Sequence, residues 1–597
     1  MSQGAQQLSH DLPIFEVIVF ASAQPEEFLG PHLLERWQTD RTLKDIIREV
    51  LKTVDYADGI PFQLDDQNEF VYSVLKNYKT LLIIDNLETT ENPQRLLAFV
   101  RSLPQSVKVI LTSRTRFGLG KTLSLNYLPL EPSLSFINHQ AQKRLVSLDA
   151  RQTKKIYQLS GGLPLAMAYS IGHLAVYGKL PTLGADSLKQ QPSEMARYCV
   201  EASLKQLKNE SAHRLLMAAT LFTGKFSAQA ATYIADLPSY ESESYQELSD
   251  LYQLSLVNKL DESYYSLHSL TQEFVRAEFN LEKDFKCTAQ KRWIDWYLKL
   301  LSPLEDNWLD WQDYSELEPE WNNVRSLMNW CIKKEEYNFL QKLWKGLRGY
   351  TLIRGYWEER QEWMGVLIAM AERKNDLEVL AQAMFYKGQT LAHMNKEGNT
   401  EKALTLLKAS WEIDSWSEPE AKFGILTYSA ALNTAQGNLE EAERWLDKRT
   451  QLSNVSIKES MRQECAYHYA IGEIYFKKKD YQNAKISYRT ALTLSKKVAW
   501  AKLDAYITSW LATLLIKENK LNEAESLLDS ISTTFEKHKD KRALAKCYYV
   551  MASLYEKKGN SAAFLEWTSL SVEQFEKLGM TAAVNQVKNL IDNSSLK

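Results

Sequence analysis

The chain has 597 residues, more than one hydrophobic core usually organises, so several domains are expected. Hydrophobic residues make up 45% and charged residues 25%, an ordinary balance for a folded soluble chain. The formal net charge of -3 gives no electrostatic reason to expect nucleic acid as an obligate partner. The five cysteines are widely separated and include no CxxC pair, which argues against a disulfide framework or a structural zinc site.

The N-terminus and the most apolar segment both lack the pattern of a membrane-directed sequence. The first fifteen residues have neither the basic start nor the long apolar run of a signal peptide. The most apolar later segment, 163–180, contains His173, Lys179 and several glycines, and it falls short of a membrane span. These features predict a cytoplasmic protein without a membrane partner.

The first third of the chain alternates between strand-like and helix-like segments. Strands buried on both faces of a parallel sheet are almost entirely apolar. The strand-like runs are 16–22 (EVIVFAS), 80–85 (TLLIID) and 107–113 (VKVILTS), and the helix-like segments are 41–54 and 91–103. This alternation predicts a doubly wound α/β domain. Alternating apolar and polar residues predict a fourth strand at 122–128.

The rest of the chain is predicted to be mostly helical. One hairpin-like stretch, 256–266, follows several helices and precedes a helical run at 270–279, an order that suggests a winged helix. From about residue 285 to 590 the pattern is helical almost throughout. Nine tryptophans lie between Trp293 and Trp363, and we expect them to pack between helices because large aromatic side chains dominate buried area.

The C-terminal third repeats a spacing of small and aromatic residues. Small residues let two antiparallel helices approach closely, and aromatic residues fill the gaps between successive pairs. The copies are Gly472, Tyr475, Ala484, Tyr488, Ala491; Ala512, Leu515, Ala524, Leu528, Ile531; Ala552, Tyr555, Phe564; and looser ones at Ala430 with Ala442 and Gly388 with Ala403. This resembles a tetratricopeptide (TPR) array of about five units with a period near 40 residues. Lysine-rich runs at 477–479 and 537–542 are predicted to be solvated helix ends.

Asp85 ends one of the predicted buried strands, in LLIIDNLE. This position is the C-terminal edge of the sheet, where open α/β folds bind ligands. A carboxylate there can orient Mg²⁺ through water, since the ion prefers hard oxygen ligands. The alternative is a structural Asp, because an apolar strand that ends in Asp is common.

Arg114 follows the next predicted strand, in VILTSRTR. If the two strands are neighbours, Arg114 would stand beside Asp85 and could contact a terminal phosphate. The alternative is an ion pair with Glu88 or another surface acid. The two segments together resemble the Walker B and sensor motifs of the NB-ARC and wider STAND families.

Two later segments resemble motifs of the same family in the expected order. SGGLPLAMAYSIGHLA, 160–175, is similar to the GLPLA signature, which implies that Pro164 packs against adenine. SLHSLTQEFVRAEF, 266–279, is similar to the MHD segment, which implies that His268 hydrogen-bonds the diphosphate of ADP and locks a closed state. The acidic third position of that motif is Ser269 here.

The resemblance implies a fold class and a domain order. The fold class is an α/β parallel-sheet P-loop-NTPase-like domain, incomplete at its N-terminus, with a helical domain, a winged helix and an α-helical TPR-like solenoid. The implied domains are an NB-ARC core at 12–130, a helical ARC-type domain at 131–205, a winged helix at 206–284, a tryptophan-rich linker with the first solenoid helices at 285–375, and TPR-like repeats at 376–590.

The phosphate-binding loop G-x-x-x-x-G-K-[ST] is not found in this sequence. The nearest match, Gly118-Leu119-Gly120-Lys121-Thr122, has Thr115 where the first glycine belongs and is better explained as a loop that enters the fourth strand. Three explanations stay open: a truncated gene model or fragment, a split system in which another polypeptide supplies the loop, and a degenerate switch.

The function implied by the resemblance is a nucleotide-switch signalling protein. Such a switch binds ADP or ATP with Mg²⁺, hydrolyses ATP slowly and self-associates on activation, although without the Walker A loop this chain alone is not expected to hydrolyse ATP. The repeats imply a protein or peptide partner. The alternatives are a TPR scaffold with a vestigial nucleotide domain and a transcription regulator that contacts DNA through the winged helix. The trigger and the output are not evident from the sequence.

Overall fold

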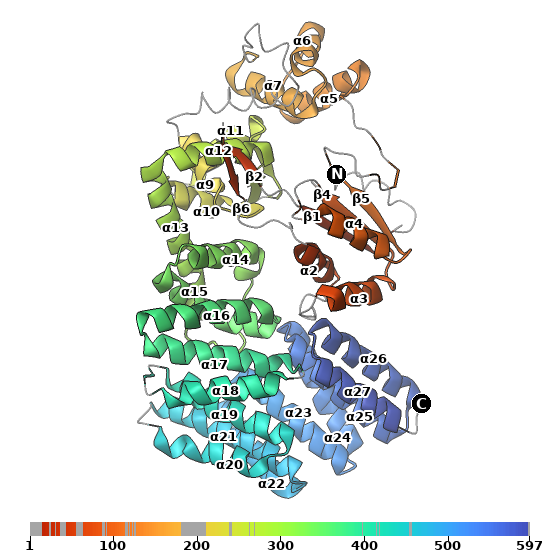
Figure 1. Cartoon of the computed structure of the whole chain (residues 1–597), viewed down its shortest axis with the longest axis vertical. Coiled ribbons are helices and arrows are strands. Elements are labelled where there is room, and N and C mark those ends of the chain that lie inside the picture. The colour runs from red at the N-terminus through yellow and green to blue at the C-terminus, as the bar shows by residue number, and fades with distance from the viewer. Residues whose placement is uncertain are drawn as a thin grey trace.

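The structure is a computed structural model, and Figure 1 shows its course from the N-terminal α/β part to the C-terminal helices. It describes residues 15–22, 26–29, 32–35, 43–54, 64–85, 87, 90, 92–113, 118, 120–121, 123, 127–180, 211–237, 241–261, 263–267, 269–396, 398–413, 415–416, 418–452 and 456–594.

The α/β part contains the three predicted parallel strands. β1 (Val17–Ser22), β4 (Thr80–Asp85) and β5 (Val107–Leu111) form one sheet in the order β1-β4-β5. The two predicted helices are also confirmed, as α2 (Leu43–Thr53) and α4 (Pro93–Ser102). The middle strand, β4, is buried along almost its whole length, so its apolar run is explained by its central place.

The described helices cover one face of this sheet. Both crossovers, β1 to β4 and β4 to β5, step in the same direction, and right-handed crossovers then place their helices on the same side. On the opposite face Ile18, Phe20 and Ile110 are 46%, 51% and 44% exposed. The expectation of a doubly wound sheet is therefore wrong for the described strands, because that fold needs a reversal of strand order. No described strand pairs with the outer edge of β5.

Three details of this region differ from the prediction. Helix α3 (Leu64–Leu75) and the antiparallel pair β2 (Glu26–Leu29) and β3 (His32–Glu35) were not expected from the sequence. The predicted fourth strand, 122–128, is not seen: its described residues, Leu123, Tyr127 and Leu128, lie in irregular structure, and the other four lie outside the described part of the chain.

A small three-helix part follows. α5 (Leu130–Lys143), α6 (Ala150–Ser160) and α7 (Pro164–Tyr177) enclose a core of their own that includes Ile137, Ile156 and Met167. Helix α6 begins with a capping box in which the Asp149 carboxylate accepts from the backbone N–H of Gln152. This helix ends at Gly161, whose left-handed conformation leads into the turn before α7.

The next part combines helices with a second, antiparallel sheet. Its elements follow the order helix, strand, helix, helix, strand, strand, helix, and the sheet has the order β6-β8-β7. The predicted hairpin is confirmed as β7 and β8. The elements are α9 (Ser211–Ala219), β6 (Lys225–Ser227), α10 (Ala228–Ala235), α11 (Glu241–Gln253), β7 (Val257–Lys259), β8 (Tyr264–Leu267) and α12 (Ser269–Leu281).

From α13 onward the structure is a curved array of antiparallel helices (Figure 1). Two short 3-10 turns, η4 (Ser302–Leu304) and η5 (Lys448–Gln451), interrupt it. The helices are α13 (Lys283–Leu301), α14 (Leu317–Lys333), α15 (Tyr337–Arg354), α16 (Trp357–Lys374), α17 (Leu377–Met394), α18 (Asn399–Glu412), α19 (Pro419–Gln436), α20 (Leu439–Asp447), α21 (Ile457–Lys477), α22 (Tyr481–Lys497), α23 (Ala501–Lys517), α24 (Leu521–Lys537), α25 (Lys541–Lys558), α26 (Ser561–Lys577) and α27 (Thr581–Asn593).

The predicted repeat of about 40 residues is confirmed in the last helices. After α21, a residue with a left-handed backbone conformation forms a turn at every twentieth position. A new helix begins two residues after each of these turns. The turn residues are Lys479, Ala499, Asn519, Lys539, Gly559 and Gly579. The small residues of the pattern are buried at the helix contacts, among them Ala484, Ala524 and Ala552. Two helices of nearly equal length therefore make one repeat.

The predicted role of the tryptophans is confirmed. Eight of the nine between Trp293 and Trp363 are buried, and Trp296 is partly buried against the same core. That core runs without interruption from the antiparallel-sheet part into the helical array. None of the helices in the described part of the chain combines the length and apolar character needed to cross a bilayer.

The curved array returns on itself. Leu352 and Trp357, at the junction of α15 and α16, share a small core with Ala545, Phe575 and Met580 from the last helices. Near this contact Arg354 donates a hydrogen bond of 2.6 Å to the backbone carbonyl of His538. Helices at the two ends of the array are thus in direct contact.

Candidate functional site

Asp85, the one residue predicted for metal binding, lies at the carboxyl ends of the parallel strands. Asp85 is the last residue of β4 and aligns with Ser22, the last residue of β1. Thr112 follows β5 directly, and its hydroxyl donates a hydrogen bond of 2.5 Å to Oδ1 of Asp85. The backbone N–H of Thr112 also donates to the Ile84 carbonyl at 2.9 Å. The Asp85 carboxylate therefore has a fixed orientation at the edge where α/β sheets bind ligands.

Thr112 is a site residue that sequence reasoning did not single out. It lies in the polar tip of VILTSRTR, and the signal for it is its place one residue beyond the end of a strand that neighbours β4. Arg114, two residues further on, lies outside the described residues. His268, between β8 and α12, also lies outside them.

Pro164 occupies the first position of α7. The turn before it is tight: Gly162 has a φ of +79°, and its carbonyl accepts from the Leu128 N–H at 3.0 Å. A Cβ at Gly162 would stand 2.5 Å from the Leu128 carbonyl oxygen, so this position excludes other side chains. A glycine turn therefore leads into α7. Pro164 itself is exposed.

The described residues do not assemble the four predicted nucleotide contacts. Figure 1 draws β4, which carries Asp85, and α7, which begins at Pro164, in separate parts of the molecule. The two other members are among the undescribed residues, so their convergence on one pocket stays a prediction. In the described part of the chain, no group of three or more His, Cys, Asp and Glu side chains gathers as for a metal ion.

A second candidate site is the inner side of the helical array, defined by α17, α19, α21, α23 and α25. Hydrogen bonds connect these helices in turn. His393 of α17 bonds to the Tyr428 hydroxyl of α19 at 2.8 Å, and the Trp510 indole of α23 donates to the Tyr469 hydroxyl of α21 at 3.1 Å. Tyr506 donates to Asp540, the N-cap of α25, at 3.0 Å.

Positive charge is concentrated on this inner side. The pKa of Lys546 is lowered, first by the neighbouring Arg542 and second by burial, although Glu473 opposes the shift. Burial raises the pKa of Glu473. The buried Nε of Arg542 has no hydrogen-bond partner. Neighbouring cations that repel one another in this way favour an acidic partner.

The prediction of solvated helix ends holds for one basic run and fails in part for the other. Lys478 and Lys479 are exposed after α21, as are Lys537 and Lys539 after α24. Arg542 is different, because it lies past the turn, in α25, the first helix of the next repeat. Its side chain contributes to the inner side of the array. The sequence does not distinguish it, since which face of α25 is turned inward depends on the curvature of the whole array.

An extended segment of the chain spans several of these helices. This segment, which we call the strap, is residues 305–316, between η4 and α14. Asp310 accepts from the backbone N–H groups of Ala501 and Lys502, at the start of α23, at 3.0 and 2.8 Å. The Trp311 indole donates to Asp540 at 3.1 Å, and its ring stacks on His538 with centroids 4.3 Å apart.

Comparisons with known proteins agree with this architecture. The tetratricopeptide repeat family model matches residues 466–498, within α21 and α22. The chain is similar to a STAND protein with a tetratricopeptide repeat sensor, PH0952 from Pyrococcus horikoshii, with 16% identity and a TM-score of 0.53, over 91% of this chain and 76% of that one. It is also 21% identical to the transcription activator GutR from Bacillus subtilis (strain 168), over 87% of this chain and 67% of the relative.

Proposed function

We propose that the chain is a nucleotide-controlled signalling protein of the STAND kind, in which the α/β part binds ADP or ATP with Mg²⁺ and the helical array senses a protein or peptide. The observation that carries this proposal is the likeness of fold, over 91% of the chain, to a STAND protein with a tetratricopeptide repeat sensor. The domain division given above, and the winged helix with its helix–strand–helix–helix–strand–strand order, belong to the same proposal.

Asp85 is the residue whose surroundings best fit the proposed cofactor. It is a carboxylate at the carboxyl edge of a parallel sheet, and the adjacent Thr112 hydroxyl adds a second hard oxygen. In this role Asp85 would hold Mg²⁺ through water, and the ion would neutralise phosphate charge. Arg114 would contact the terminal phosphate, Pro164 the adenine and His268 the diphosphate.

Nucleotide content tests the proposal. Protein purified without added nucleotide is denatured, and the released ADP and ATP are quantified by chromatography. We expect ADP to be released, and Mg²⁺ with ATP to raise the melting temperature. The variant Asp85→Asn should remove the Mg²⁺-dependent part of that increase, because a neutral amide cannot replace the carboxylate. Asp284→Asn, an exposed acid in the first turn of α13, is the matched control and should behave like the wild type.

A preparation that contains no nucleotide and shows no melting shift with Mg²⁺ and ATP would contradict the switch. The second candidate function, a binding scaffold, would then account for the chain. It is favoured by the cationic inner side of the array, which offers Lys546 and Arg542 to an acidic protein or peptide whether or not nucleotide is bound. Transcription regulation, the function in the name of the Bacillus subtilis relative, remains a further alternative, which DNA binding by the full chain would support.

A further inference from the structure

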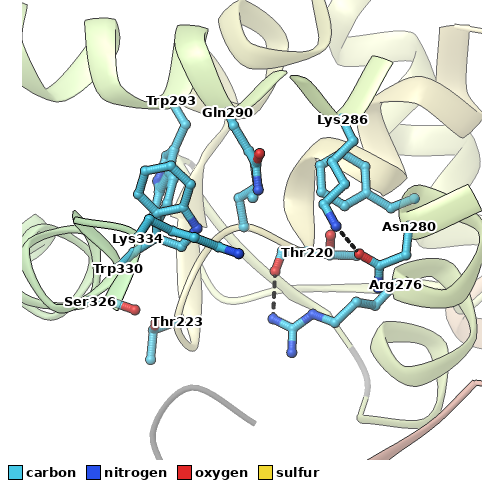
Figure 2. A pocket seen from close by; sticks show the side chains of 12 residues that line it. Thr220, Thr223, Arg276, Asn280, Lys286, Gln290, Trp293, Ser326, Trp330 and Lys334 are labelled. Atoms are coloured by element: carbon cyan, nitrogen blue, oxygen red, sulfur yellow. Dashed lines mark hydrogen bonds between the residues drawn. The ribbon is translucent and has the colours of Figure 1, made fainter. Parts of the chain in front are cut away.

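A pocket of about 210 Å³ lies where the antiparallel-sheet part meets the first helices of the array (Figure 2). Its walls come from the loop after α9 and from three helices, α12, α13 and the end of α14. The lining residues are Thr220, Leu221, Thr223, Arg276, Phe279, Asn280, Lys286, Gln290, Trp293, Ser326, Trp330 and Lys334. Asp85 and Pro164, the two described residues that are proposed to contact nucleotide, are not among them.

The charged residues that line this pocket in the described part of the chain are all cations. Arg276 comes from α12, Lys286 from α13 and Lys334 from the C-cap of α14, and no Asp or Glu among the described side chains lines the cavity. In Figure 2 the side chains of Lys334 and Arg276 extend toward the middle of the pocket from opposite sides. Three cations from three helices therefore share a space in whose walls the structure describes no carboxylate.

The hydrogen bond of Lys286 leaves its charge without a described acidic partner in the pocket. Lys286 donates to the side-chain oxygen of Asn280, and Arg276 donates to the Thr220 carbonyl at 2.9 Å, so both of these acceptors are neutral. Among the described residues, neither lysine forms an ion pair with an acid. The pKa of Lys286 is lowered by burial first, and then by the nearby Lys334 and Arg276. Like charges this close raise the energy of the empty pocket, and an anion would relieve it.

Neutral donors complete the lining. Trp293 is 3% exposed, and its indole N–H is buried without a hydrogen-bond partner. Buried N–H groups without an acceptor are rare in folded proteins. Thr223, Gln290 and Ser326 add hydroxyl and amide groups at the same cavity. A ligand with several acceptor oxygens would match this combination of cations and neutral donors.

We propose that this pocket binds a small phosphorylated molecule. A phosphate group offers several acceptor oxygens and up to two negative charges, which suits two lysines and an arginine. The volume is below the roughly 300 Å³ at which pockets for drug-sized ligands begin, so the class that fits is a small phosphate ester and not a nucleotide. The bound anion would join α12 to α13 and α14, and so tie the antiparallel-sheet part to the array. This inference goes beyond the proposed nucleotide switch and does not depend on it.

The test measures binding of inorganic phosphate and of glycerol phosphate to the full chain, by melting temperature and by calorimetry at constant ionic strength. Both probes should stabilise the wild type saturably, with glycerol phosphate no weaker than phosphate. Lys286→Met and Lys334→Met should each weaken binding by roughly fivefold or more, because each removes a charge-assisted hydrogen bond. The matched control is Lys283→Met, an exposed lysine at the start of α13, which should bind as the wild type does.

A second variant keeps the test decisive if the loss of a lysine disturbs the fold. Lys334→Glu places a carboxylate beside Lys286, so it should raise the melting temperature in phosphate-free buffer and abolish the response to phosphate. Asp85→Asn should leave the phosphate response intact, which separates this site from the proposed nucleotide site. The proposal is overturned if the wild type shows no saturable response, or if the Lys286 and Lys334 variants respond as Lys283→Met does.

Discussion

His393 is a buried histidine in an electropositive environment. It lies on α17, and its only described hydrogen bond is with the Tyr428 hydroxyl. Its pKa is lowered well below the usual value, first by burial and then by four cations: Arg542, Arg360, Lys502 and Lys546. Three of these cations belong to α23 and α25, so the pKa of a side chain on one helix reports on the closed shape of the array.

The stability of the chain should therefore fall as the pH drops through the usual histidine range. In the unfolded chain His393 takes up a proton near pH 6.5, whereas the folded state resists this, so protonation favours unfolding below that pH. We expect the melting temperature to decrease between about pH 7.5 and 5.5, and His393→Gln to reduce the decrease by the equivalent of about 1–2 kcal/mol. The control is His139→Gln, an exposed residue of α5. An identical pH profile for both variants would contradict this account.

Single residues were predictable where a local rule decides their place. Asp85 ends an apolar strand, and Gly161 with Gly162 forms a turn that only glycine adopts easily, so both follow from a few neighbours in the chain. Thr112 and Arg542 depend on elements distant in sequence. Their roles follow from the strand order and from the curvature of the array, which no local pattern contains.

The paired helices α21 and α22 approach each other closely at Gly472 of α21. A Cβ at this position would stand 2.7 Å from the Tyr488 ring of α22, and Tyr488 is fully buried. Gly472→Ala should therefore destabilise the array by about 1–3 kcal/mol, as overpacked cores do. The matched control is Gly365→Ala in α16, where the added methyl meets only the mobile end of Lys387 at 3.2 Å.

The two glycine variants should change the free energy of unfolding in opposite directions. Gly365→Ala should stabilise the chain by roughly 0.5–1 kcal/mol, because alanine is the better helix former. Denaturant midpoints of both variants, measured against the wild type, test this pair of expectations. Destabilisation of equal size by both would show that helix ends or backbone effects, and not the contact with Tyr488, set the outcome.

At the scale of elements, periodic patterns predicted most of the structure. The apolar runs identified three strands, and the spacing of small residues identified the repeat helices, since each pattern is imposed by burial on one side of an element. Helix α3 was missed because its first half, LDDQNE, is polar. In the run 122–128, which alternates as a strand does, the described residues Leu123, Tyr127 and Leu128 are irregular, because alternation alone provides no neighbouring strand with which to pair.

Over the whole molecule, the strap holds the array in its closed form. Asp310 caps α23, and Trp311 contacts Asp540 at the start of α25, so one short segment fixes two repeats that are about 200 residues away in the sequence. The Arg354 bond to His538 strengthens the same closure. This long-range arrangement could not be predicted from the sequence, because a repeat pattern defines neighbours but not how far the array turns.

Loss of the strap contacts should loosen the last repeats selectively. In Asp310→Ala the N–H groups of Ala501 and Lys502 lose their acceptor, which should cost about 1–2 kcal/mol, as for other helix caps. Hydrogen exchange of 501–593 should accelerate more than that of 317–394. Asp313→Ala, an exposed strap residue bonded only to nearby Ser315, is the control and should leave exchange unchanged. Uniform acceleration in both regions would contradict the selective role of the strap.

The exposed apolar face of the parallel sheet has a practical consequence for experiments on fragments of the protein. Ile18, Phe20 and Ile110 expose an apolar surface to solvent. This surface lies beside a strand edge whose backbone groups have no described strand partner. A recombinant fragment confined to this part is expected to self-associate, either by stacking through the apolar surface or by strand pairing at the edge of the sheet. Truncation experiments on the α/β part therefore need light-scattering checks before any loss of binding is attributed to a missing residue.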